Sequence, residues 1–223
     1  MNTSNQFTIS INALKGLDLL AAKGDIRYYL NGVNVEFNET TTRLVATNGH
    51  ILGIENLTQD LLNTGAGSLI IPSDIIKALK PVSKNADIVQ IKQIDAGHWE
   101  IDNYGVKITF TAIEGKFPDY ARVVSGAKTT GQSAQYNADY LATFLKAAKL
   151  LTGAKTPDIE IMQNGHSAAL VNITGLASFI GVIMPTKGKT GDEQAGGLAS
   201  PTLYAPLAAA EQPAAIAAWI CSG

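Results

Sequence analysis

The stretch TRLVATNGHILGI, residues 42–54, contains a tight-turn signal between two apolar runs. The dipeptide Asn48-Gly49 is a tight-turn signal, and the flanking Val, Leu and Ile residues favour strands. The preceding residues 27–37 are also rich in Val, Leu and Tyr and predict a further strand. This part of the chain is therefore expected to form β-sheet.

Outward from this turn, strand-like and helix-like segments alternate in units of about sixty residues, a period that indicates a structural repeat. Helices are predicted over residues 13–23, from 73 up to Pro81, and over 138–151. Their predicted N-caps are, in the same order, Asn12, Ser73 and Asn137. Gly24 is predicted to end the first helix and Gly153 the third. The remaining strands are predicted over residues 7–11, 68–71, 88–94, 98–103, 106–113, 159–163, 168–173 and 179–184.

The composition restricts the class of protein. Seventeen basic and nineteen acidic residues among 223 give a net charge of −2, which excludes nucleic-acid binding by bulk charge but allows a local basic face. The single Cys221 predicts neither an internal disulfide nor a zinc site. Without a secretory signal pattern or an apolar stretch of about 20 residues, the chain is expected to be cytoplasmic, metal-free and not bound to a membrane.

The sequence offers little support for catalysis. His50, His98 and His166 stand alone among strand or turn residues, and neither G-x-S-x-G nor H-E-x-x-H occurs. Gly188-Lys189-Thr190 resembles the end of a phosphate-binding loop, but Ile183 occupies the position that needs glycine. The chain is therefore expected not to be an enzyme and to need no cofactor.

Lysines concentrate on the predicted helices, although a solvated helix face is the simplest explanation for any one of them. If the fold placed these helices on one common surface, their lysines would give that surface a positive charge that attracts DNA phosphates. The candidate DNA-facing residues are Lys15, Lys23, Lys77, Lys80, Lys84, Lys146 and Lys149.

Four ordered motifs resemble the bacterial DNA polymerase III β subunit, the sliding clamp family. They are DIRYYLNGV at 25–33, LVATNGH at 44–50, GKFPDY at 115–120 followed by Arg122-Val123, and VIMP at 182–185. The resemblance implies the α+β DNA clamp architecture, in which strand–helix–strands half-domains place helices along a channel and antiparallel sheets outside. It further implies a non-catalytic processivity factor that encircles double-stranded DNA as a homo-oligomeric ring.

The resemblance also predicts how the chain is divided. Residues 1–123 resemble one complete clamp domain, the family's middle domain, and residues 124–187 resemble the end of its last domain in shortened form. Residues 188–223 are rich in Gly, Ala and Pro and are expected to be a flexible tail. Such shortening is more typical of a phage or mobile-element clamp than of a housekeeping one.

The family holds short linear peptides of DNA polymerase and clamp loader in a hydrophobic pocket. Carried over by position, that pocket comprises Leu30, Thr47, Gly49, His50, Leu52, Pro118, Arg122, Val123, Val182, Met184 and Pro185. Ile51, Ala121 and Thr186 depart from residues that the family often has, and these departures are expected to make the pocket less charged. A second hypothesis remains open: a clamp-derived module that binds such peptides without closing a ring around DNA.

Overall fold

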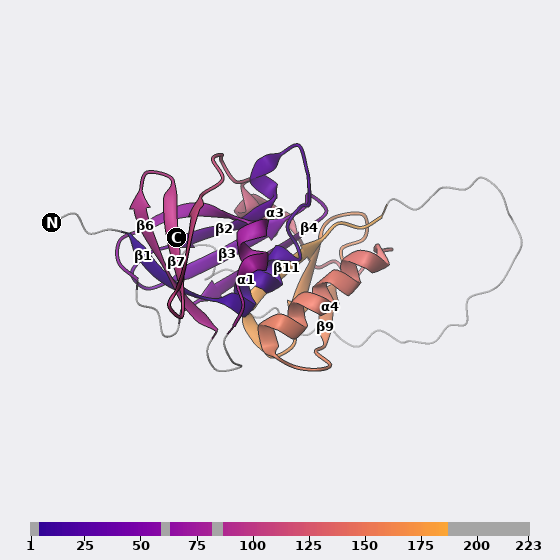
Figure 1. Cartoon of the computed structure of the whole chain (residues 1–223). Coiled ribbons are helices and arrows are strands. Elements are labelled where there is room, and N and C mark those ends of the chain that lie inside the picture. Colours follow the sequence, from indigo (N-terminus) through magenta and orange to yellow (C-terminus); the bar gives the residue numbers. More distant parts are fainter. Residues whose placement is uncertain (1–4, 59–62, 82–86, 187–223) are drawn as a thin grey trace, which may run out of the picture. The chain divides into compact units, whose positions relative to one another are not determined.

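A computed structural model describes residues 5–58, 63–81 and 87–186 (Figure 1). The predictions for Lys84, for Cys221 and for the tail 188–223 lie outside these residues. Within the described ranges the strands form two antiparallel sheets. One has the order β1 (Gln6–Ser10), β6 (Ile88–Asp95), β7 (His98–Asn103), β8 (Val106–Thr111). The other has the order β5 (Gly67–Pro72), β2 (Gly32–Phe37), β3 (Thr42–Thr47), β4 (Ile51–Leu57), β11 (Leu176–Ile183), β10 (Ala169–Ile173), β9 (Ile159–Met162).

The tight turn between β3 and β4 forms where the sequence predicts it. The side-chain oxygen of Asn48 accepts hydrogen bonds from the N–H groups of His50 and Ile51, at 2.9 and 3.0 Å. Gly49 has φ +90°, a backbone conformation that glycine adopts without steric cost. The Asn-Gly dipeptide therefore sets both the turn and the register of the two strands.

The helices are α1 (Ile11–Asp18), α2 (Ser73–Ala78), α3 (Tyr120–Gly126) and α4 (Ala138–Thr152), with a 3₁₀ turn, η1 (Tyr28–Leu30). For α4 the predicted caps are confirmed: the Asn137 side chain accepts from the N–H of Asp139, and Gly153 ends the helix with φ +69°. The short helix α3 was not predicted, although Asp119 caps it by accepting from the N–H of Arg122.

Two predicted caps are wrong. Ser10, not Asn12, caps α1 by accepting from the N–H of Ala13, while the Asn12 amide donates to Asp87. This helix also ends at Asp18, earlier than predicted. Pro72 holds the N-cap position of α2 without a side-chain hydrogen bond, and Ser73 is buried as the first helical residue.

The predicted strand 27–37 is half wrong, because its first part folds into η1. The Asn31 side chain binds both the N–H and the carbonyl of Asp25, at 2.9 and 2.8 Å, and closes a tight loop there. These local side-chain bonds compete with the sheet ladder, so the strand starts only at Gly32.

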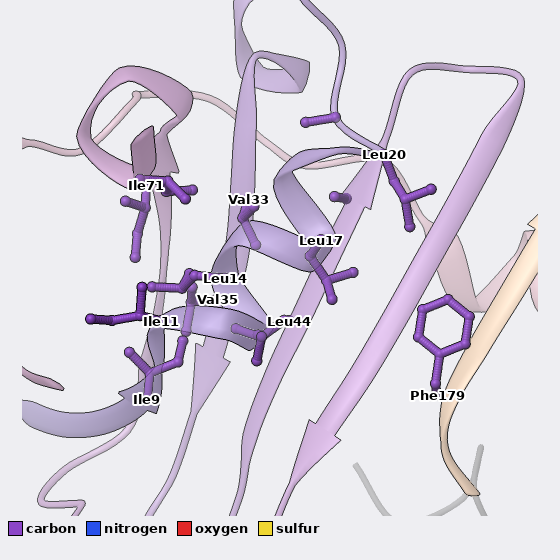
Figure 2. Packing of buried hydrophobic residues seen from close by; sticks show 14 of the residues in the cluster. Ile9, Ile11, Leu14, Leu17, Leu20, Val33, Val35, Leu44, Ile71 and Phe179 are labelled. Carbon is purple, nitrogen blue, oxygen red and sulfur yellow. The ribbon is translucent and has the colours of Figure 1, made fainter. Parts of the chain in front are cut away.

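Helix α1 lies against the sheet and between two other helices, contacting both α2 and α4. Figure 2 shows Leu14 and Leu17 of α1 directed at strand residues of the core such as Val35 and Leu44, and Leu20, just after α1, on the side of Phe179. These side chains are fully buried, so burial of apolar surface fixes α1 on the sheet.

The β4–β11 ladder connects the segments predicted as separate domains, 1–123 and 124–187. Gly53 pairs directly with Gly181 on the face that the helices cover. At Gly53 a Cβ atom would collide with Leu20, just after α1, and at Gly181 it would lie 2.7 Å from Phe144 of α4. Residues 5–186 belong to one compact unit, and their division into a whole and a shortened domain stays a prediction. No helix in the described part is long and apolar enough to cross a membrane.

Candidate functional site

A cavity of about 250 Å³ opens on the face of the β4–β11 ladder away from α1 and α4. Four segments that are distant in sequence contribute to its lining, namely residues 27–30, 47–52, 118–123 and 182–184. The lining residues are Arg27, Leu30, Thr47, Gly49, His50, Ile51, Leu52, Pro118, Tyr120, Val123, Val182 and Met184.

Nine of the eleven residues predicted from the sequence line this cavity. The other two, Arg122 and Pro185, lie beside it: Arg122 is exposed on α3 and Pro185 is half-buried after β11. The prediction missed Arg27, Ile51 and Tyr120. Each of these three stands inside or next to a quoted motif, so the sequence contained the signal.

The floor of the cavity is apolar and closed, whereas part of its rim is open. Leu30, Leu52 and Val182 are at most 5% exposed, and Leu52 pairs directly with Val182 across the β4–β11 ladder. Val123 and Met184 are 42% and 41% exposed at the rim. Such a hollow can bury one or two aliphatic side chains of a ligand, which the exposed rim residues would then cover.

The wall at the β3–β4 turn is held by hydrogen bonds within the turn. The Thr47 hydroxyl donates to the carbonyl of Ile51 at 2.7 Å and accepts from the N–H of Gly49 at 3.0 Å. The N–H of Met184 donates to the carbonyl of His50 at 2.9 Å, which ties the end of β11 to the turn. The two hydrogen bonds of the Thr47 hydroxyl therefore stabilise the conformation of the turn that forms this wall.

An ion pair and a ring stack border the cavity. The Arg27 guanidinium binds the Asp25 carboxylate through two hydrogen bonds of 2.7 and 3.0 Å. These bonds to Arg27 lower the pKa of the Asp25 carboxyl to about 2, so the pair stays charged at neutral pH. The exposed His50 ring stacks on Tyr140 of α4, with ring centres 5.7 Å apart. The rim thus offers the Arg27–Asp25 ion pair and the His50 ring beside an apolar floor.

The predicted DNA-facing lysines lie on or next to α1, α2 and α4. Lys23, Lys77, Lys80, Lys146 and Lys149 are exposed, and Lys15 is half-buried. Lys77 is paired with Asp74 at 3.3 Å. Because α1 contacts both other helices, these lysines belong to one group of adjacent helices.

Two buried carboxyls lie outside the pocket lining. Burial raises the pKa of Asp18, while the Ser73 hydroxyl and Lys77 act in the opposite direction. Burial also raises the pKa of Glu55 to about 7, against the hydrogen bond that it accepts from Ser178 at 2.6 Å. Among the described residues, no group of three or more His, Cys, Asp or Glu side chains could hold a metal ion.

A larger cavity, of about 620 Å³, contains none of the predicted residues. Its lining includes residues 112–117, Asn34 and Glu36 of β2, and Trp99 of β7. Residues 112–117 lead directly into the Pro118–Val123 wall of the smaller cavity.

Comparison with known proteins identifies the family. The family model described as "DNA polymerase III beta subunit, central domain" matches residues 6–119, just over half of the chain. The beta sliding clamp of Buchnera aphidicola subsp. Rhopalosiphum padi is 34% identical over 168 residues, which cover 72% of this chain and 44% of that protein. The beta sliding clamp of Pseudomonas aeruginosa is 33% identical over 128 residues, or 54% of this chain and 34% of that one. The chain spans less than half the length of these two relatives.

Solved structures confirm the fold. A sliding clamp of Pseudomonas aeruginosa with ligand superposes with a TM-score of 0.61 at 20% identity, covering 82% of this chain and 66% of the other. The β subunit of Thermotoga maritima gives a TM-score of 0.65 at 14% identity, covering 84% and 66%. The predicted α+β clamp architecture is therefore confirmed, and with a family match over more than half of its residues the chain belongs to the DNA polymerase III β subunit family.

Proposed function

We propose that this chain is a non-catalytic DNA sliding clamp that tethers polymerase and clamp loader through short linear peptides. The observation that carries the proposal is the cavity of about 250 Å³, which gathers nine predicted residues from four distant segments. The relatives that support it are named sliding clamps. Such a protein would need no cofactor and would act in the cytoplasm.

The chemistry of the pocket suits an extended peptide with a hydrophobic end. The closed floor at Leu30, Leu52 and Val182 would take an apolar anchor residue, and Met184 is flexible enough to adapt to its shape. Buried apolar anchors in well-formed pockets carry most of the binding energy of such interfaces. The charged pair at Arg27 would act at the rim, where it affects selectivity more than affinity.

The helix face suits weak contact with DNA. Exposed lysines on adjacent helices supply a local positive charge in a chain whose net charge is −2. Phosphate contacts of this kind do not depend on base sequence and weaken as salt rises. A ring that encircles DNA stays on it without tight phosphate binding, so a moderate number of lysines is sufficient.

A second candidate function is peptide binding without a closed ring. It is favoured by the closed apolar floor of Leu30, Leu52 and Val182, which a single copy of the chain already forms and which could bind a peptide without a second copy. The two candidates differ in the oligomeric state that they require. Light scattering at high protein concentration separates them: a stable oligomer supports the ring, and a monomer supports the module.

The peptide pocket can be tested with a labelled peptide that ends in two hydrophobic residues, by fluorescence polarisation on the full chain. The expected result is saturable binding that is lost when both end residues are alanine. The Ile94→Ala variant, altered at an exposed residue of β6, is a matched control and should bind like the original chain. Equal binding of both peptides would refute an apolar anchor site.

A further inference from the structure

Helix α3 forms one wall of the pocket, yet it has few apolar contacts to hold it. Val124 is the buried residue among Tyr120–Gly126, and the neighbouring Val123 faces the pocket rim at 42% exposure. The helix has two turns, a length at which a helix depends on tertiary contacts for its stability. Another interaction is therefore needed to fix its position.

That interaction is made by the phenol of Tyr120, the first residue of α3. Its hydroxyl donates a hydrogen bond to Oε2 of Glu36 at 2.6 Å. Nη1 of Arg43 donates to the same hydroxyl oxygen at 3.3 Å and lies 3.9 Å from Oε2 of Glu36. Hydrogen bonds to charged groups are stronger than neutral ones, and a chain of them is cooperative.

The partners of Tyr120 are themselves fixed on the sheet. Glu36 of β2 pairs with Arg43 of β3, which pairs with Asn56 of β4, so the three form a row across adjacent strands. Nε of Arg43 donates to Oδ1 of Asn56 at 2.9 Å, and the Asn34 amide donates to Oε1 of Glu36 at 3.1 Å. We call Glu36, Arg43 and Asn56 the polar row.

The Tyr120 hydroxyl keeps its proton in this environment. Burial, and next the hydrogen bond to Glu36, raise the pKa of Tyr120 to about 12. The phenol is therefore a donor throughout the range of pH in which the protein would work. Meanwhile Glu36 and residues 112–117 border the cavity of about 620 Å³, so the segment leading to α3 has open space on that side.

We propose that the polar row is a positioning device for the peptide pocket: by holding the Tyr120 hydroxyl, it keeps α3 and its Val123 side chain in place as the pocket wall. The inference rests on the proposed peptide-binding function. Glu36 and Arg43 do not line the pocket and would affect a peptide only through Tyr120.

The test compares Glu36→Ala, Tyr120→Phe and the double variant for binding of the labelled hydrophobic peptide. Each single change removes the same hydrogen bond, so each should weaken binding about five- to tenfold, and the double variant should be little worse than either. Glu36→Gln keeps an acceptor oxygen and should recover most of the affinity. Glu114→Ala is the matched control, because Glu114 is an exposed carboxylate at the same large cavity. Its affinity should not change.

Hydrogen exchange of the α3 amides supplies a measurement that does not depend on the peptide. In Tyr120→Phe and Glu36→Ala, amides of residues 122–126 should exchange at least about tenfold faster, while those of β3 and β4 stay unchanged. Unchanged α3 exchange, or peptide affinity within twofold of the original chain in both single variants, would overturn the inference. If the original chain bound no peptide, the proposed function would fail, and the exchange result would still decide whether the polar row holds α3.

Discussion

The two faces of the β4–β11 ladder differ although they share one backbone. The pair Leu52 and Val182 lies under the pocket, and the next pair, Gly53 and Gly181, lies under the helices. On the pocket side, rim residues such as Met184 are partly exposed and have room to move. On the helix side, even one added carbon atom would collide with α1 or α4. Neighbouring residues of the same two strands thus face opposite sides of the sheet: one side is a pocket surface that can adapt to a ligand, and the other is a tightly packed helix interface that cannot.

The helix side also contains a buried carboxyl. Glu55 pairs with Phe179, whose ring packs edge-on against Phe144 of α4. Glu55 is 3% exposed, and within the described part of the chain its Oε2 has no hydrogen-bond partner. A charge at this position would be costly, because among the described residues the Ser178 hydroxyl is the one donor to the carboxyl.

The largest expected effect is on stability as a function of pH. Burial raises the pKa of Glu55 from 4.5 to about 7, so the folded chain binds this proton more tightly than the unfolded chain does. The resulting stabilisation is complete below pH 4.5 and is lost as pH rises through 7. Between these limits the free energy of unfolding should fall by about 3 kcal/mol from this group.

Glu55→Gln is the matched variant, since its amide oxygen can still accept the Ser178 hydrogen bond. Urea unfolding from pH 5 to pH 8 should show the decline in the original chain and a flatter profile in the variant. Parallel profiles for the two proteins would show that Glu55 titrates normally.

Gly181→Ala should give the next largest effect. The new Cβ would lie 2.7 Å from the Phe144 ring and 3.1 Å from the carbonyl oxygen of Val171, and the backbone cannot easily move away. We expect a loss of about 2 kcal/mol in the free energy of unfolding, measured in urea. Gly126→Ala is the control, because nothing lies within 4 Å of its added Cβ. Equal stability of the two variants would mean that the helices can move aside.

The sequence predicted elements well where a local signal and the final packing agree. The Asn48-Gly49 turn and the Asn137 and Gly153 ends of α4 are examples, because the residues that form them are neighbours in the chain. The start of α1 was placed wrongly because Asn12 and Ser10 are both capable caps. Asp87, 75 residues away from Asn12, accepts hydrogen bonds from both the Asn12 amide and the Ser10 hydroxyl, and it is the Ser10 oxygen that also accepts from the N–H of Ala13.

Prediction of the pocket from the sequence is limited in the same way, by contacts between distant segments. Positions inside motifs led to nine of its lining residues; Arg27 and Tyr120 stand inside two of the same motifs, but contacts with segments outside those motifs bring them to the pocket. Arg27 comes close to Gly49, and Tyr120 reaches Glu36 across 84 positions of sequence. No periodicity could have predicted the row of Glu36, Arg43 and Asn56, since it depends on the register of three strands.

On the adaptable face of the ladder, Met184→Ala should weaken binding of the hydrophobic peptide by about 1–2 kcal/mol, roughly tenfold. The change removes apolar contact from an exposed rim residue, so the free energy of unfolding should change little. Fluorescence polarisation and urea unfolding measure the two quantities. Unchanged peptide affinity in a folded variant would place the anchor elsewhere. A large loss of stability would mean that the pocket face is as tightly packed as the helix face.

The smallest expected effect concerns the exposed lysines of the helices. Lys146 and Lys149 of α4 are exposed, and the double change to Glu should lower DNA association a few-fold and reduce its salt dependence, because each lost phosphate contact removes about one released counterion. Peptide affinity should stay the same, since neither lysine lines the pocket. The matched control reverses Lys92 and Lys116, which are exposed outside the helices and change the net charge equally. If both double variants lost DNA association to the same extent, net charge rather than the helix face would govern binding. A loss confined to the α4 variant, measured over a series of salt concentrations, would locate the DNA contact on the helices.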